Sequence, residues 1–367
     1  MSQLRRPGTM AEVGNLIAVS SCKGGVGKST LAAALALALA ARGRAVGLLD
    51  LDVHGPSLPT LFGLGQVPVE NEGQNLVPYQ HAGISLFSFG LLAGGNPAVL
   101  RGPMLAGVVR QLLCNVAWGK LDDLVLDLPP GTGDVHLTVS QIVGLDGAVI
   151  VSTNHALARP DVENGLLMFS QVAVPVLGLI ENMAWFECGS CGAKHEVFGG
   201  SAAKQVQERF GLRCLARLPL LSGAACAPAE LAARGELKVM AEAVLEALAE
   251  TRDHTLLPEA VLGPARLELH WPDSTLGVIE FKALRRHCRC AECEDARRRG
   301  VYDETALPAE PVAVELHWLG NYALSVRWQD GHRSGIYPLT LLRELAAYGK
   351  ACRCRHEDGN VNATPRN

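Results

Sequence analysis

The chain has 367 residues, 48% of them hydrophobic, and a formal net charge of -4 at pH 7. This length favours two domains with separate cores, and the balanced charge argues against a general attraction to nucleic acid or to a membrane surface. No apolar run approaches the roughly 18 residues of a membrane helix, and the first residues lack the apolar centre of a secretory signal.

We therefore expect a cytoplasmic protein. A bacterial cytoplasm is favoured over an organelle, because the first predicted strand begins too early to leave room for a transit peptide. In a reducing compartment the two tight groups of cysteines indicate metal ligands rather than disulfides. The isolated Cys114, Cys214 and Cys226 are expected to be small core residues.

Short apolar runs alternate with longer helical stretches between residue 15 and about residue 252. The runs expected to be strands are 16–19, 45–49, 124–126 and 148–151. Strands that are apolar throughout are typical of a mainly parallel sheet wrapped by helices. The stretches 30–41 and 229–249 are rich in Ala and Leu and predict helices, the second of which closes the domain.

A glycine-rich loop follows the first strand, and residues 21–30 read Ser-Cys-Lys-Gly-Gly-Val-Gly-Lys-Ser-Thr. Between a strand and a helix, such a loop binds polyphosphate through backbone N–H groups, with Lys28 at the β and γ phosphates and Ser29 on Mg²⁺. The predicted nucleotide-binding residues of this P-loop are Gly24, Gly25, Val26, Gly27, Lys28, Ser29 and Thr30. Cys22 stands where the ordinary loop has Gly, and together with Lys23 it marks a variant loop. The loop predicts an ATPase that uses ATP and Mg²⁺.

Carboxylates follow two of the predicted strands. Asp52 precedes a turn that lets it lie over the γ phosphate, and Asp127 is expected in the magnesium shell beside a glycine-rich loop. Asp50 and Asp134 serve either the nucleotide chemistry or a turn or helix cap, and the sequence does not choose between these roles.

The first cysteine pair, Cys188 and Cys191, lies in a small glycine turn. A 4Fe-4S cluster takes four cysteines, so a symmetric homodimer in which each chain donates this pair completes the set most simply. The alternative is a zinc knuckle, with His195 as third ligand and Cys214 or Cys226 as fourth.

Residues 253–264 contain two prolines and a glycine and are expected to be a linker between a first domain, 1–252, and a second, 265–348. In the second domain apolar residues alternate at 267, 269 and 271, at 312, 314, 316 and 318, and at 324, 326 and 328. This alternation predicts an antiparallel sheet with one solvated face. A helix over 339–348 and a mobile tail, 349–367, complete the chain.

Three further thiols, those of Cys288, Cys290 and Cys293, lie in one loop of this second domain. His332, which follows the Asp330-Gly331 turn of the last hairpin, is the best candidate for a fourth ligand. Three thiolates and an imidazole favour Zn²⁺ in a structural role, which stabilises a small domain with a limited core. We therefore expect an α/β P-loop domain followed by a small α+β domain with a metal site.

Five segments of the first domain resemble one known family. They are 23–30, 52–57, 101–104, 127–134 and 181–183, and in this order they are similar to the ParA/MinD ATPases with a deviant P-loop, and among these to the Mrp (ApbC-like) iron-sulfur cluster carriers. The resemblance covers roughly the first 250 residues. It implies that Lys23 crosses a dimer interface to the partner's nucleotide, that Asp52 positions the hydrolytic water and that Asn182 contacts adenine.

The segment 267–345 resembles the amino-terminal zinc domain of gamma-butyrobetaine dioxygenase. The likeness lies in the three-cysteine motif, in Gly320-Asn321-Tyr322 and in Asp330-Gly331-His332. The two histidines and carboxylate of an oxygenase centre do not follow, so no oxygenase activity is inferred.

Together these resemblances imply an ATP-dependent carrier that holds a labile 4Fe-4S cluster in a homodimer and passes it from cluster donors to apoproteins. No nucleic acid or membrane partner is expected. The alternatives are a ParA/MinD-like positioning ATPase, which needs a basic surface or a terminal amphipathic helix, and a zinc-containing regulatory ATPase switch.

Overall fold

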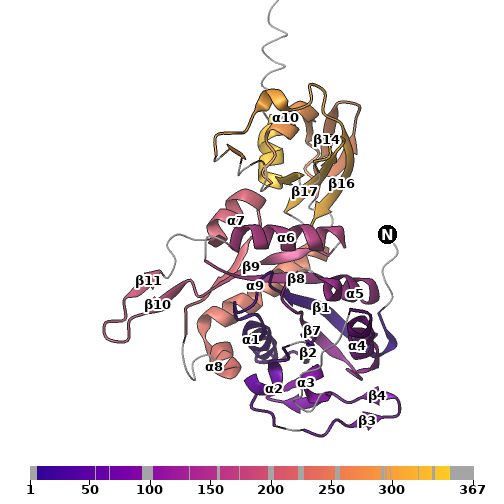
Figure 1. Cartoon of the computed structure of the whole chain (residues 1–367), viewed down its shortest axis with the longest axis vertical. Helices are drawn as coiled ribbons and strands as arrows, with labels where there is room; N and C mark the ends of the chain where they lie inside the picture. The colour runs from indigo at the N-terminus through magenta and orange to yellow at the C-terminus, as the bar shows by residue number, and fades with distance from the viewer. Residues whose placement is uncertain are drawn as a thin grey trace, which may run out of the picture. The chain divides into compact units, whose positions relative to one another are not determined.

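The computed structural model describes residues 6–53, 55–65, 67–92, 102–131, 133–154, 158–172, 174–196, 202–221, 227–252, 257–290, 293, 296–297, 299–320, 322–332 and 335–347. Contacts divide the chain into two compact units (Figure 1). One is Met1–Gln207 with Leu212–Arg252, and the other is Glu208–Gly211 with Asp253–Asn367. The predicted tail 349–367 lies outside the described residues. Within the described ranges, no helix has the length and apolar character needed to span a membrane.

The first unit is built on an eight-stranded sheet with the order β12-β9-β8-β1-β7-β2-β6-β5. Neighbouring strands are parallel except for β5, which runs antiparallel to β6 at one edge. The strands of this sheet are β1 (Val13–Ser20), β2 (Val46–Asp50), β5 (Tyr79–His81), β6 (Ile84–Ser88), β7 (Leu121–Asp127), β8 (Gly147–Thr153), β9 (Val176–Asn182) and β12 (Cys214–Arg217). The mainly parallel sheet predicted from the apolar runs is confirmed, since four central strands contain those runs.

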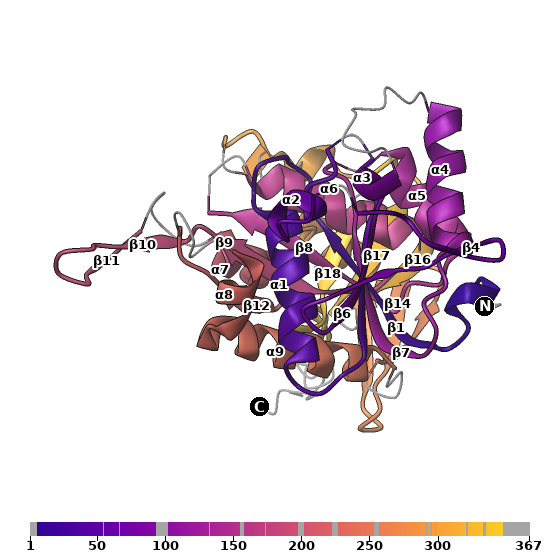
Figure 2. The same cartoon turned by 90° about the horizontal axis from the view of Figure 1, so that it is seen from below.

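Helices pack against this sheet, as Figure 2 shows. They are α1 (Lys28–Ala40), α2 (Leu58–Leu61), α3 (Phe89–Leu92), α4 (Gly102–Asn115), α5 (Asp134–Ile142), α6 (Ala158–Gln171), α7 (Ala202–Phe210), α8 (Pro228–Ala233) and α9 (Gly235–Arg252). The Ala/Leu helix α1 packs against α8 and α9 and is buried from Leu31 to Leu39, as a helix that is apolar on all sides requires. Two short hairpins, β3 (Asn71–Glu72) with β4 (Asn75–Leu76) and β10 (Trp185–Glu187) with β11 (Lys194–Glu196), lie outside the main sheet.

The single helix predicted over 229–249 is wrong, because the chain forms two helices there. Arg234 separates α8 from α9 in an extended conformation, with φ -68° and ψ 147°. Gly235 follows it, and glycine has a weak helix propensity because its backbone loses the most freedom on folding. Arg234, at this break, lines a pocket together with Gly27 of the P-loop.

The second unit contains two antiparallel three-stranded sheets where the sequence predicted one. They are β13 (Glu259–Leu262), β14 (Arg266–His270) and β15 (Leu276–Glu280), and β16 (Ala313–Leu319), β17 (Ala323–Trp328) and β18 (Gly335–Pro338). Helix α10 (Phe281–Arg286) follows β15, and residues 339–347 are helical. Strand β13 lies within the segment 253–264 that was expected to be a linker, and residues 253–256 of that segment are outside the described ranges.

A β-bulge changes the inside-outside alternation of β16. The sequence places Val312 and Val314 on the apolar face of this strand, but their side chains are 42% and 50% exposed. The pairing with β17 shifts between Ala313 and Glu315, so one extra residue lies on β16 and the parity of the buried face changes there.

We expect Gly178→Ala to destabilise the first unit by about 1–3 kcal/mol, the usual cost of overpacking. A Cβ atom at this position of β9 would lie 2.8 Å from the backbone oxygen of Arg213, which cannot rotate away. The midpoint of urea unfolding measures the effect. The matched control is Gly107→Ala in α4, where a Cβ atom meets nothing within 4 Å, and it should be neutral or slightly stabilising. Equal midpoints for the two variants would contradict the close packing of β9.

Candidate functional site

The P-loop connects the end of β1 to the first turn of α1. Gly25 and Gly27 adopt positive φ angles of 77° and 84°, which a side chain at either position would strain. Lys28 begins the helix directly after Gly27. The loop thus aims backbone N–H groups and a helix N-terminus at one point, an arrangement that binds phosphate.

Lys28 and Asp127 form a buried ion pair at the carboxyl edge of the sheet. The ammonium group contacts Asp127 Oδ1 and lies 3.1 Å from Ser29 Oγ. Both side chains are almost fully buried, at 6% and 0% exposure. Burial raises the pKa of Asp127, and the Lys28 charge opposes that rise. Asp127 Oδ2 is buried and has no hydrogen-bond partner in the described part of the chain. An unpartnered carboxylate oxygen beside the Ser29 hydroxyl provides the oxygen donors that Mg²⁺ prefers.

Asp50 holds the turn after β2. Its carboxylate accepts hydrogen bonds from the Asp52 amide at 3.0 Å and from the Ser88 hydroxyl at 2.9 Å. Burial, together with the nearby Asp127 carboxylate, raises the pKa of Asp50 to about 7. These contacts support the turn-holding role among the two that the sequence left open. The turn presents Asp52, whose Oδ1 accepts a hydrogen bond from the Gly55 amide at 3.2 Å.

The two residues that mark the P-loop as a variant, Cys22 and Lys23, differ in exposure. Lys23 is exposed, while Cys22 is partly buried and packs toward α6. A Cβ atom at Gly165 of α6 would come within 2.7 Å of the Cys22 sulfur, so the missing side chain at Gly165 makes room for that thiol. This complementarity agrees with Cys22 as a residue that is accommodated at the loop entry. The role of Lys23 across a dimer interface stays a prediction. His54, Arg101 and Thr132, which belong to the segments that carry the family resemblance, lie outside the described residues.

Asn182 touches the P-loop from the end of β9. Its side-chain amide donates a 2.9 Å hydrogen bond to the backbone oxygen of Val26. A Cβ atom at Gly27 would lie 2.5 Å from the same amide nitrogen, so glycine is required at this contact. Asn182 therefore supports the loop, whether or not it also meets the base as the resemblance implies.

A largely apolar pocket of about 100 Å³ opens beside this contact. Its lining includes Gly27, Thr30, Asn182, Met183, Leu218, Pro219, Leu220, Leu221 and Arg234. Pockets with apolar walls and a few polar groups suit flat heterocycles, and this one adjoins the phosphate-binding loop. This pocket is therefore a candidate site for a nucleotide base, and we call it the base pocket below.

His136 on α5 is a site residue that the sequence analysis missed. Its imidazole is 1% exposed, and its Nε2 lies 3.0 Å from Ser20 Oγ at the end of β1. Burial, together with the Lys28 charge, lowers the pKa of His136 to about 4, so the ring is neutral at pH 7. The one sequence signal for a role of His136 near the nucleotide site is its position two residues after the glycine-rich loop 127–134.

Cys188 and Cys191 lie where the hairpin of β10 and β11 turns (Figure 1). This cluster hairpin, residues 185–196, projects from the main sheet. Cys191 is exposed and Cys188 is partly so. The Cys188 amide donates to the Ala193 oxygen at 2.9 Å and the Gly192 amide donates to the Cys188 oxygen at 2.8 Å, which closes the turn. Hydrogen bonds from the backbone of Ser190 and Cys191 lower the pKa of Cys188 and favour the thiolate, the form that ligates metal.

The described ranges do not support the zinc-knuckle alternative. Among their residues, no group of three or more His, Cys, Asp or Glu side chains close enough to hold one metal ion includes Cys188 or Cys191. The His195 ring stacks on Phe186, with 5.0 Å between ring centroids, and the Cys214 thiol donates to the Ala216 oxygen at 3.5 Å. Cys226 lies outside the described residues. Each chain therefore offers two described thiols at this turn.

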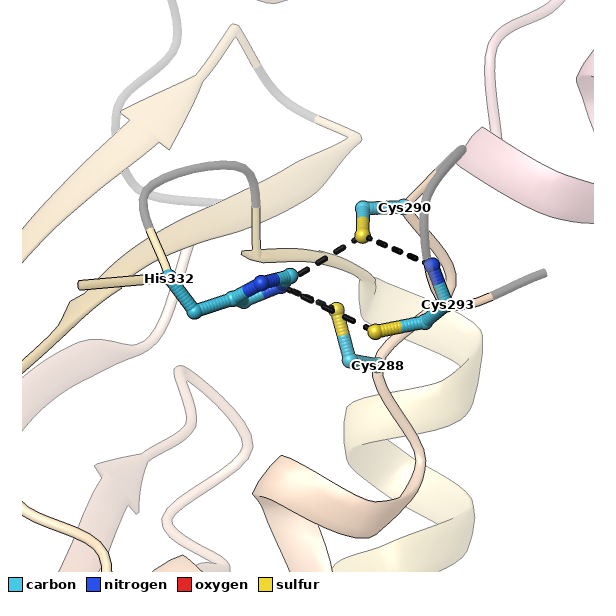
Figure 3. A group of neighbouring side chains, drawn as sticks. All are labelled: Cys288, Cys290, Cys293 and His332. Atoms are coloured by element: carbon cyan, nitrogen blue, oxygen red, sulfur yellow. Dashed lines mark hydrogen bonds between the residues drawn. The ribbon is translucent and has the colours of Figure 1, made fainter. Parts of the chain in front are cut away.

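The second unit brings Cys288, Cys290, Cys293 and His332 together, as Figure 3 shows. Their ligand atoms all lie within 4.8 Å of one another. His332 Nε2 is 3.2 Å from the sulfur of Cys288, 3.4 Å from that of Cys290 and 3.9 Å from that of Cys293. The three thiols are at most 6% exposed and belong to the hydrophobic core of this unit. Three thiols and one imidazole this close together form a candidate metal site.

Arg285 links two parts of this site. Its Nε donates to Asp330 Oδ2 at 3.0 Å, and its Nη1 donates to the Cys293 sulfur at 3.7 Å. Asp330 in turn accepts a hydrogen bond from the His332 amide at 2.9 Å. Hydrogen bonds from the neighbouring thiols, with help from the Arg285 charge, lower the pKa of Cys293 to about 3. The guanidinium thus offsets thiolate charge and also holds the loop that carries His332.

Two family profiles match the chain, one on each unit. The profile of the NUBPL iron-transfer P-loop NTPases (ParA) matches residues 12–248. The profile of the gamma-butyrobetaine hydroxylase-like N-terminal domain matches residues 263–343, which include the Cys3His site.

Relatives resemble the chain over different extents. The chain is 38% identical over 356 residues to the chloroplastic Fe-S cluster assembly factor HCF101 of Oryza sativa. This alignment covers 92% of this chain and 66% of that protein. It is 45% identical over 210 residues to the iron-sulfur cluster carrier protein of Escherichia coli. That alignment covers 57% of each of the two proteins. The chain thus spans two thirds or less of the length of these relatives.

One solved structure supports the geometry of the first unit. A nucleotide-binding protein from Archaeoglobus fulgidus in complex with ADP aligns with a TM-score of 0.56 and 39% identity. The match covers 62% of this chain and 92% of that protein.

We expect the nucleotide-free protein to lose about 2 kcal/mol of stability through His136 between about pH 7 and about pH 5. Its pKa in the folded state, about 4, lies below the ordinary 6.5, so the unfolded chain takes up the proton first as the pH falls. The contribution is fully present above the unfolded pKa and is lost as the pH falls toward the folded one. Urea unfolding at the two pH values measures it.

His136→Gln removes the titration and keeps a neutral polar side chain. Its stability should therefore fall less than that of the wild type over the same pH interval, since all other titrating groups are shared. Parallel losses in both proteins would show that the buried imidazole does not resist protonation.

Proposed function

Because the chain belongs to the NUBPL iron-transfer P-loop NTPases of the ParA family, we propose that it is an ATP-dependent iron-sulfur cluster carrier. The cluster is its cargo, and apoproteins are its clients. The observation that carries the proposal is that each chain has its own P-loop with the Lys28–Asp127 pair but, among the described residues of the cluster hairpin, only two thiols. Two copies are then needed to supply the four cysteines of a 4Fe-4S cluster.

In the proposed nucleotide cycle, the P-loop binds the phosphates of ATP and the base pocket takes the adenine. Lys28 shares its charge between Asp127 and the phosphates, and Ser29 with Asp127 would hold Mg²⁺, which offsets phosphate charge. In this proposal Asp52, whose Oδ1 accepts a hydrogen bond from the Gly55 amide, orients the attacking water, and the exposed Lys23 reaches a partner's nucleotide. Both of these roles follow from the family resemblance.

The cluster hairpin suits a cargo that must leave. Cys188 and Cys191 are accessible, and an exposed thiolate pair at a glycine turn lets an apoprotein approach the cluster directly. The cytoplasmic location expected from the sequence stays a prediction, since the rice relative is named as chloroplastic.

We assign Zn²⁺ to the Cys3His site as a resident structural ion. A tetrahedral ion at about 2.3 Å from sulfur and about 2.0 Å from nitrogen separates those atoms by about 3.5 Å. The observed separations from His332 Nε2, between 3.2 and 3.9 Å, bracket this value. A buried, closed site of this kind stabilises a small core and does not release its ion readily.

We expect Cys188→Ala to abolish cluster loading while ATP hydrolysis continues, because the thiol is a ligand and does not belong to the nucleotide site. Anaerobic reconstitution with iron and sulfide, followed by metal and sulfide analysis per chain, measures loading. Size-exclusion chromatography of the loaded protein reports whether two copies hold the cluster.

Cys214→Ala is the matched control, since this thiol lies in β12 and donates within its own strand. It should load as the wild type does. A full cluster in Cys188→Ala, or a full complement of iron on a strictly monomeric wild type, would refute the ligand assignment.

We expect Arg285→Gln to weaken zinc retention by about 10–100-fold, the usual effect of losing a group that supports a metal ligand. The change removes the cation that contacts Cys293 and Asp330. Zinc transfer to a chromogenic chelator measures it. Arg286→Gln removes a neighbouring cation that is 45% exposed and pairs with Glu304, and it should leave retention unchanged. Equal zinc loss from both variants would argue against the role of Arg285.

A further inference from the structure

One short segment belongs both to the base pocket and to the root of the cluster hairpin. Strand β9 ends at Asn182, which donates to Val26 in the P-loop, and β10 begins three residues later at Trp185. Met183, between them, lines the base pocket. The chain therefore passes from the base pocket to the cluster hairpin without an intervening helix or strand.

Met183 adopts a left-handed backbone conformation, with φ 56°. A non-glycine residue in this region costs on the order of 1 kcal/mol or more, and it persists only where its surroundings hold it. Here the neighbouring residues hold it through backbone hydrogen bonds. The Leu218 amide donates to the Glu181 oxygen at 2.8 Å, and the Ala184 amide donates to the Leu218 oxygen at 2.9 Å.

The strap Leu218–Leu221 is the second shared element. Its four residues line the base pocket. Its Leu220 amide also donates a 2.6 Å hydrogen bond to the backbone oxygen of Trp185, the first residue of the cluster hairpin. Any movement of the strap that accompanies filling of the pocket therefore acts on the hairpin root.

Arg217 connects the strap to the hairpin through its side chain. The guanidinium pairs with the fully buried Glu181 at 2.5 Å and reaches Glu196 on β11 at 3.5 Å. It also lies 5.9 Å from the ring centroid of Trp185 on β10. Glu181 is the residue directly before Asn182, so one cation links the base-pocket wall to both strands of the hairpin.

We propose that Met183 and Arg217 are positioning residues, through which filling of the base pocket sets the placement of Cys188 and Cys191. This inference rests on the proposed function for its biological meaning. Its physical content is a link between pocket and hairpin that exists in the cluster-free protein. The link makes the exposure of the two thiols depend on whether a nucleotide is bound.

The test measures the alkylation rates of Cys188 and Cys191 in cluster-free protein, with and without saturating ADP, by mass mapping of their peptide. We expect ADP to change these rates about tenfold in the wild type, within the usual range of coupling between sites. Because no cluster is needed, failure here is distinct from failure of the carrier proposal, which the reconstitution of Cys188→Ala decides.

Two variants of Met183 separate backbone strain from side-chain contact. Met183→Ala removes the same pocket contacts as Met183→Gly but keeps a residue that resists the left-handed conformation. We expect Met183→Gly to reduce the ADP response to less than about twofold, and Met183→Ala to keep most of it. ADP affinity measured on each variant defines the saturating concentration.

A second pair of variants tests the side-chain link without disturbing the buried Glu181 carboxylate. Glu196→Gln removes the hairpin end of the Arg217 contact and should lower the ADP response by a few-fold. The matched control, Glu187→Gln, makes the same chemical change at a carboxylate that pairs with Lys194 inside the hairpin and should leave the response intact. An unchanged response in both Met183→Gly and Glu196→Gln, no response in the wild type, or a response that varies with protein concentration would overturn the proposal.

Discussion

The nucleotide site depends on the parallel pairing of β1 with β7, because this pairing places the ends of the two strands at the same edge of the sheet. Val19 is the register partner of Asp127, so the loop that follows β1 begins where the β7 carboxylate ends its strand. Lys28 and Asp127 then meet in a buried ion pair. Neither charge is tolerable alone at that depth, since an unpaired buried ion costs several kcal/mol. The pair therefore keeps a lysine and a carboxylate poised for phosphate and Mg²⁺.

The two cysteine groups show how environment decides the use of the same ligand. Cys288, Cys290 and Cys293 are buried in an apolar core with His332, and Arg285 offsets their charge. Such a site binds one ion tightly and stays closed. Cys188 and Cys191 are only two described thiols on an accessible turn, fewer than the four that a 4Fe-4S cluster takes. We propose that the first site stabilises a domain and that the second carries cargo.

In our proposal the nucleotide site is linked to the cluster hairpin through adjacent backbone segments rather than through a long chain of contacts. The base pocket and the cluster hairpin share the turn around Met183 and the strap from Leu218 to Leu221. A strained residue at such a junction keeps its conformation only while its surroundings hold it, so a change in those surroundings acts on it directly. This arrangement gives nucleotide binding a short physical route to the cysteines.

Features that depend on local chemistry could be predicted from the sequence. The apolar runs fixed the mainly parallel sheet, the glycine loop with Lys28 fixed the phosphate site, and the spacing of three cysteines with His332 fixed the metal-binding group. The tertiary structure alone decided features that depend on which strands become neighbours. It paired Asp50 with Ser88, brought His136 to Ser20 and Asn182 to the P-loop, and placed Arg217 between Glu181 and the hairpin. These contacts join residues that are far apart in sequence, so no local pattern of helix or strand propensity or of hydrophobic periodicity encodes them. The bulge in β16 could not be predicted either, because it depends on the register between β16 and β17.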